Sequence, residues 1–109
     1  MLLPGLTRVV GRSMEPTLRD GDLLLVLWGA RPRTGGLALV LLPDDDAGLA
    51  RPVAVKRVTG RDPADPTRWL VERDNPREGV DSWSLGSLAE DAMLARVLLR
   101  LPCRRRPFA

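Results

Sequence analysis

Apolar residues along this chain fall into short runs, and the positions between the runs are rich in turn-forming residues. The runs are four to eight residues long, and ten glycines and ten prolines are scattered among them rather than clustered. The three-to-four-residue apolar spacing of a long amphipathic helix is hard to find. This pattern is typical of short strands joined by turns, so we predict a mostly β domain with little helix.

Six apolar segments are the expected strands. They are Thr7–Val10, Leu23–Trp28, Leu37–Leu42, Val53–Thr59, Trp69–Glu72 and Ala95–Leu101. The third segment is apolar throughout, which suits a strand covered on both faces. Loops are expected at Gly29–Gly36, Arg61–Thr67 and Arg73–Val80, and a short helix or turn at Leu88–Leu94.

The length of 109 residues fits a single domain with one core. We expect the folded core over about residues 7–100, followed by a basic tail at 101–109. No apolar run approaches the roughly 20 residues of a membrane span, and Met1–Leu6 is too short for a secretion signal. The single Cys103 cannot form an internal disulfide, so we expect a cytoplasmic protein.

The composition also argues against several kinds of site. The chain has no histidine and one cysteine, so a zinc or nickel site has no plausible ligand set, and we expect no metal and no other cofactor. The net charge is +3, with one dense basic cluster at Arg104–Arg106. Without a basic helix or interleaved aromatics, we interpret that cluster as a solvated terminus rather than a nucleic-acid interface. The adjacent carboxylates Asp44–Asp46 are likewise expected to be solvated.

The segment Gly11–Asp22 holds a serine in a setting suited to a nucleophile. Gly11 has access to backbone angles that other residues avoid, and Pro16 fixes its own φ and pushes Glu15 toward extended geometry. Asp20–Gly21 follows as a strong turn signal before the next strand. We therefore expect Ser13 to lie on a rigid bend.

A serine nucleophile needs a base, and Lys56 is the side chain that fits. Without histidine a Ser-His-Asp triad is impossible, and sixteen of the seventeen basic residues are arginines, which stay protonated. A desolvated lysine can lose its proton near neutral pH, and strand alternation places Lys56 on one face with Ala54 and Val58. Taken alone, a surface lysine beside Arg57 on an edge strand is the commoner case. Its uniqueness and its pairing with Ser13 favour a Ser/Lys dyad.

Three motifs in this order resemble those of type I signal peptidases, which are serine/lysine peptidases. They are Gly11–Leu18 with Gly21–Asp22, then Lys56–Gly60, and then Asp74–Asn75 with Asp81–Ser82 and Gly86. The match runs from about Thr7 to Arg100. Residues 71–76, 79–83 and 85–86 most resemble the nickel-type superoxide dismutase maturation proteases, which are cytoplasmic relatives of the signal peptidases.

The resemblance implies a signal-peptidase-like β catalytic core and a serine endopeptidase without a metal. Lys56 would take the proton of Ser13, whose backbone N–H would stabilise the oxyanion. Gly11, Met14 and Ser82 are further candidates for the oxyanion hole and the substrate cleft, with ordinary core packing as the alternative for Met14. The substrate would lie extended along a sheet edge. The implied substrate is the N-terminal extension of a nickel-type superoxide dismutase precursor.

Several positions depart from the family pattern. Gly11 stands where part of the family has a serine that completes the oxyanion hole, Gly79 where a serine often orients the lysine, and Trp83 where an arginine follows Asp-Ser. The second oxyanion donor and the group that orients Lys56 therefore stay open, with Ser82 as one candidate for the orienting group.

Two other functions are compatible with these residues. Self-cleaving repressors of the LexA-like kind also use a Ser-Met motif and a distant lysine, but they need a cleavage segment and a DNA-binding domain upstream, and twelve residues precede Ser13 here. A noncatalytic β module that binds a protein partner is the second alternative. Such a module does not need a base, whereas this sequence keeps one lysine among its arginines.

Overall fold

The computed structural model describes residues 2–44, 47–49, 53–77 and 82–101. Its strands form one antiparallel seven-stranded sheet in the order β1-β2-β7-β3-β4-β5-β6. The strands are β1 (Leu3–Arg8), β2 (Leu23–Trp28), β3 (Leu37–Leu41), β4 (Val53–Asp62), β5 (Asp65–Glu72), β6 (Leu88–Ala89) and β7 (Met93–Leu101). The helices are α1 (Ser82–Leu85) and the 3-10 helix η1 (Glu90–Ala92). The prediction of a mostly β fold is confirmed.

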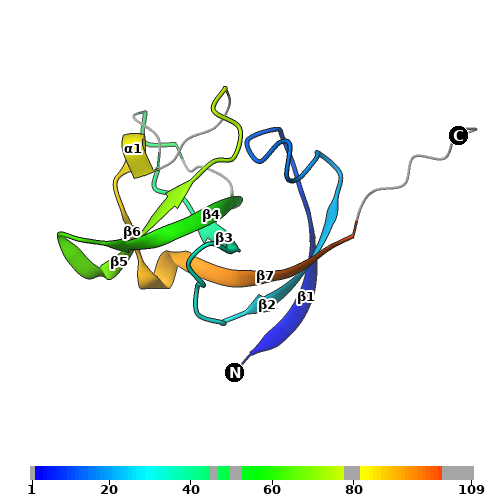
Figure 1. Cartoon of the computed structure of the whole chain (residues 1–109), viewed down its shortest axis with the longest axis horizontal. Coiled ribbons are helices and arrows are strands. Elements are labelled where there is room, and N and C mark those ends of the chain that lie inside the picture. The colour runs from blue at the N-terminus through cyan, green and yellow to red at the C-terminus, as the bar shows by residue number, and fades with distance from the viewer. Residues whose placement is uncertain (1, 45–46, 50–52, 78–81, 102–109) are drawn as a thin grey trace, which may run out of the picture.

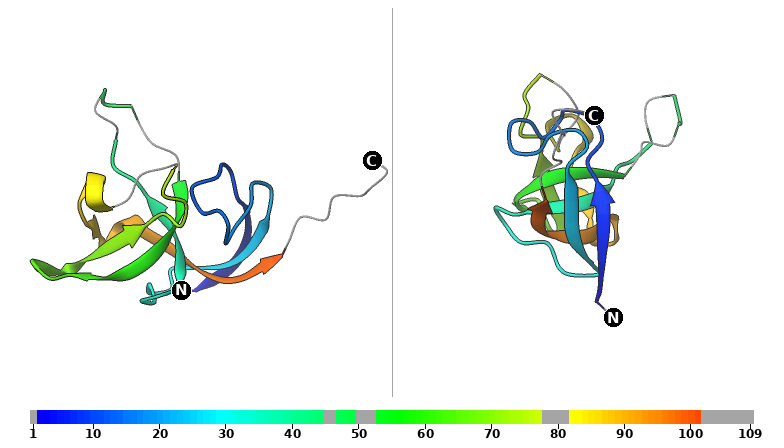
Figure 2. Two further views of the ribbon diagram at one scale, coloured as in Figure 1. Left: turned by 45° about the horizontal axis from the view of Figure 1, so that its top comes forward. Right: turned by 90° about the vertical axis from the view of Figure 1, so that its right-hand side faces the viewer.

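The long strand β7 joins the two halves of the sheet. It pairs with β2 on one side and with β3 on the other, and the register shifts in both ladders. Such irregularities bend a strand and increase its twist. The sheet is accordingly curved, and the β1–β2 connection and the loop after β5 rise on the same side of it (Figures 1 and 2).

Two apolar clusters fill the two faces of the sheet, as the alternation of β3 requires. Ala38 and Val40 belong to the first cluster, together with Val58 and Val71. Leu39 belongs to the second cluster, against which Leu37 packs. The expectation that this strand is covered on both faces is therefore correct.

The bounds of several predicted elements were wrong. The first strand runs over Leu3–Arg8 rather than Thr7–Val10, because its ladder with β2 extends from Leu3 to Arg8. Pro4 is tolerated there because β1 is an edge strand. The predicted Arg61–Thr67 loop is mostly strand: β4 and β5 pair up to Asp62 and Asp65. The Asp62 carboxylate accepts the N–H of Ala64 in the turn, and the Asp65 carboxylate accepts the N–H of Thr67 in β5.

The C-terminal third also differs from the expected elements. The short turn after β6 is the 3-10 helix Glu90–Ala92, within the predicted Leu88–Leu94 segment. The closing strand begins at Met93, and α1 was not expected. Residues 78–81, which include Gly79 and Asp81, and the tail from 102 with Arg104–Arg106 lie outside the described residues. Among the described residues, no helix has the length and apolar character needed to cross a bilayer.

Candidate active site

The β1–β2 connection that carries Ser13 is closed at its base by backbone hydrogen bonds. Val9 N–H donates to Asp22 C=O and Gly21 N–H donates to Val9 C=O, both at 2.8 Å. Within the loop, Asp20 Oδ1 accepts the N–H of Gly11 at 2.8 Å. Gly11 and Gly21 have φ values of +87° and +92°, which favour glycine. The loop is thus held by its own polar groups.

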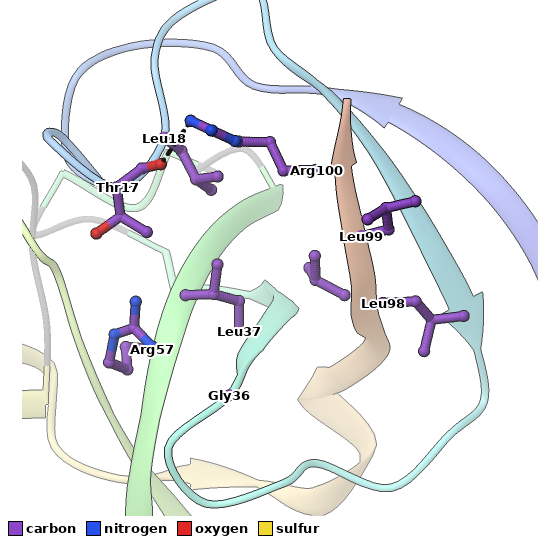
Figure 3. Close-up of a pocket in the computed structure, with 9 residues that line it drawn as sticks. Thr17, Leu18, Gly36, Leu37, Arg57, Leu98, Leu99 and Arg100 are labelled. Carbon is purple, nitrogen blue, oxygen red and sulfur yellow. Dashed lines mark hydrogen bonds between the residues drawn. The ribbon is translucent and has the colours of Figure 1, made fainter. Parts of the chain in front are cut away.

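Two apolar side chains fasten this connection to the sheet. Met14 and Leu18 are 2% and 1% exposed and belong to the second apolar cluster. Leu18 N–H donates to Met14 C=O at 2.9 Å, so both side chains are presented by one turn. Arg100 of β7 donates to Thr17 C=O at 3.2 Å (Figure 3). The burial of Met14 supports core packing for this residue rather than a place on the wall of a substrate cleft.

Truncating Leu18 tests this anchoring. Leu18→Ala is expected to lower the free energy of unfolding by about 3 kcal/mol, because a filled core position becomes a cavity. Leu41→Ala is the matched control, since Leu41 is 48% exposed, and it should cost less than about 1 kcal/mol. Chemical denaturation of both variants measures the difference. Equal losses would show that the connection is not anchored through Leu18.

Ser13 directly precedes the anchor Met14 and is half-buried. Its C=O accepts the N–H of Asn75 at 2.8 Å. Within the described part of the chain, its N–H and hydroxyl take part in no hydrogen bond, which leaves both able to meet a substrate carbonyl. The N–H of Gly11, in contrast, is already donated to Asp20. Gly11 therefore shapes the loop rather than supplying an oxyanion donor.

Lys56 lies in the interior of the protein. It is 2% exposed and faces the same side of β4 as Ala54 and Val58, which belong to or pack against the first apolar cluster. Its cross-strand partner on β3 is Ala38. The alternative of a surface lysine is therefore wrong. An amine in such surroundings has little water to stabilise its charged form.

One edge of β4 next to Lys56 is open. On one side β3 pairs with the whole segment from Val53 to Arg57. On the other side the β5 ladder begins only at Arg57, opposite Glu72, because the chain leaves β5 at that point. Along the described residues, no strand follows Val53–Lys56 on this second side.

The free backbone groups of this edge can be identified from the pleat. Val58 N–H donates to Gly36 C=O, and Val58 C=O accepts from Gly35 N–H, so the polar groups of Val58 point toward the β3 side. Along an antiparallel strand these groups alternate between the two sides. Those of Val53 and Val55 consequently point to the open edge, where an extended peptide can pair with them.

An ion pair ties β4 to the loop after β5. Arg57 binds Asp74 with two hydrogen bonds, from Nε to Oδ1 at 2.9 Å and from Nη2 to Oδ2 at 2.8 Å. These bonds, helped by the Thr17 hydroxyl, hold the pKa of Asp74 below its ordinary value against the opposing effect of burial. The next residue, Asn75, bonds to Ser13. The residue after Lys56 is thus linked to Ser13: Arg57 makes two hydrogen bonds to Asp74, and Asn75, the next residue in the chain, makes one to Ser13.

Acid should weaken this connection. Because the folded-state pKa of Asp74 is lowered, its ionised form stabilises the fold above the unfolded pKa of about 3.9, and this stabilisation is lost as the pH falls below that value. The difference in unfolding free energy between wild type and Asp74→Asn should be constant above about pH 5 and shrink toward pH 3. Denaturation across this range measures it, and a difference that does not change with pH contradicts the assignment.

Ser82, a candidate for the group that orients Lys56, makes a hydrogen bond to the backbone of β5. Its Oγ accepts the N–H of Val71 at 2.8 Å. Val71 lies opposite Val58, whose polar groups face β3, so the Val71 N–H points away from β4. Ser82 therefore ties α1 to the far side of β5. This position supports a structural role rather than the orientation of Lys56.

Two pockets flank the site. One, of about 540 Å³, lies between the Ser13 connection and the loop after β5. The other, of about 390 Å³, has apolar walls from Leu37 and Leu98 and polar ones from Arg57 and Arg100 (Figure 3). Since Arg57 and Lys56 point to opposite faces of β4, this second pocket lies across the strand from the candidate base.

The arrangement provides the parts of a Ser/Lys nucleophile site. It has a serine on an anchored loop, a buried lysine and, beside that lysine, an edge of β4 that none of the described strands pairs with. The role of Asp74 and Asn75 was not foreseen from the residues, although the Asp-Asn pair was part of the resemblance. No family model, no curated protein and no solved structure matches the chain.

Proposed function

We propose that this protein is a serine endopeptidase that removes an N-terminal extension from a precursor protein. The observation that carries the proposal is the burial of the only lysine, at 2% exposure, beside an open strand edge. Lysine is rarely buried fully without a reason. A buried amine can serve a serine nucleophile as a base at neutral pH without histidine.

In this mechanism neutral Lys56 accepts the hydroxyl proton of Ser13 while Ser13 Oγ attacks the substrate carbonyl. The Ser13 N–H donates to the oxyanion, an interaction worth about 3 kcal/mol in comparable sites. The protonated lysine then gives its proton to the leaving amine, and the same base activates water to hydrolyse the acyl-enzyme. The substrate lies extended and pairs with the edge of β4 at Val53 and Val55.

The substrate follows from the resemblance of the three motifs. We propose the precursor of a nickel-type superoxide dismutase, cleaved in the cytoplasm at the end of its N-terminal extension. In this scheme the peptidase removes the extension and does not handle the metal, in keeping with its lack of histidine.

Intact-mass spectrometry of the precursor tests the function. The precursor is incubated with wild type, Ser13→Ala and Lys56→Arg, and a single cut by wild type alone is expected. A cut that persists in Lys56→Arg would refute the dyad, because arginine does not act as a base. No cut by wild type would refute the substrate. A mass change in the peptidase itself would instead favour a self-cleaving protein.

A further inference from the structure

The 540 Å³ pocket next to Ser13 is built around the side chain of Asn75. Asn75 Nδ2 donates to Arg12 C=O at 2.8 Å, and Asn75 Oδ1 accepts Arg77 N–H at 3.0 Å. One amide thus holds the backbones of two arginines that are 65 positions apart, and both arginines line the pocket. Because Arg12 precedes Ser13 directly, the pocket opens beside the candidate nucleophile.

The pocket carries more positive charge than its own carboxylates neutralise. Asp74 lines it but is bound by Arg57. Glu15 is 4.0 Å from Arg12, and both side chains are well exposed, at 38% and 68%, so this pair is weak. Arg77 has no ion pair within the described part of the chain. Two guanidinium groups are therefore available to a ligand.

We propose that this pocket is a substrate subsite for an acidic side chain near the scissile bond. The inference rests on the peptidase function proposed above and adds the substrate's chemistry. The planar guanidinium groups of Arg12 and Arg77 match a carboxylate in charge and geometry. An extended peptide advances about 3.4 Å per residue, so the acidic residue lies within roughly three positions of the cleaved bond.

A position-scanning peptide series tests the subsite. The peptides are acetylated and amidated, so their only carboxylate is one Asp moved along the sequence, and each has an Asn counterpart. We expect wild type to cleave the Asp peptide about tenfold faster at one position. In the double variant Arg12→Gln/Arg77→Gln the Asp and Asn peptides should be cleaved at nearly equal rates. Arg77→Glu should instead prefer a peptide with Lys at that position. Arg33→Gln, an exposed arginine away from the pocket, should keep the wild-type preference.

Two results would overturn the subsite. One is equal cleavage of Asp and Asn peptides by wild type at every position, and the other is a preference that survives the double replacement. Either leaves the peptidase function intact. If wild type cleaves none of the peptides, binding of fluorescent Asp and Asn peptides to Ser13→Ala still decides the inference, and the precursor experiment decides the peptidase function. Equal affinities refute it, whereas tighter Asp binding that Arg77→Gln removes supports it.

Discussion

Lys56→Met is expected to abolish peptide cleavage and to leave the fold as stable as the wild type. Without its base the reaction should lose at least about 10³-fold in kcat/KM. Methionine fits the space because its unbranched side chain adapts to apolar surroundings, here those of Ala54 and Val58. The free energy of unfolding should stay within about 1 kcal/mol of wild type or rise, as is common when a functional polar group leaves a core.

Comparison with Lys56→Arg separates chemistry from folding. Arginine is also inactive as a base, but it places a larger and permanently charged group at a position that is 2% exposed. This variant should therefore be inactive and less stable, whereas Lys56→Met is inactive and stable. Thr59→Val, at an exposed position of the same strand, should keep full activity. Cleavage by Lys56→Met within tenfold of wild type would rule out the dyad.

The sequence predicted those parts of the fold that depend on local pattern. Period-two alternation placed Lys56 with Ala54 and Val58, and the continuous apolar run identified β3 as a strand with two covered faces. The prediction was wrong where strand pairing determines the ends of a strand. The expected first strand began at Thr7, yet the β2 ladder also incorporates Pro4 and Gly5 in an edge strand, where a missing N–H is tolerated.

The sequence predicted which residues carry the chemistry of the candidate site, but not the tertiary contacts that hold them in place. The absence of histidine and the single lysine point to Lys56, and the turn residues of Gly11–Asp22 point to Ser13. The bond from Asn75 to Ser13 and the ion pair of Arg57 join residues 62 and 17 positions apart. The amino-acid pattern around Asp74 and Asn75 does not distinguish these two residues from other polar loop residues. The burial of Met14 and the contact of Ser82 with Val71 likewise follow from tertiary packing.

The Arg57–Asp74 pair should control the geometry of the nucleophile. The side chains are 32% and 14% exposed, so the pair is neither fully solvated nor fully buried. Arg57→Met removes both bonds to Asp74 and should cost about 1 to 3 kcal/mol of folding free energy. Because the next residue holds the Ser13 carbonyl, cleavage should also fall, by about 10- to 100-fold for a displacement of an ångström or less.

A double-mutant cycle with Asp74→Leu separates the pair from its surroundings. If the two residues act together, the double variant should lose less stability and activity than the sum of the single variants, with a coupling of at least about 1 kcal/mol. The exposed pair Arg12 and Glu15, 4.0 Å apart, is the control cycle for stability and should show almost no coupling. Additive losses for Arg57 and Asp74 would mean that each residue acts through other contacts. The loop after β5 would then not depend on this ion pair to hold Ser13 in position.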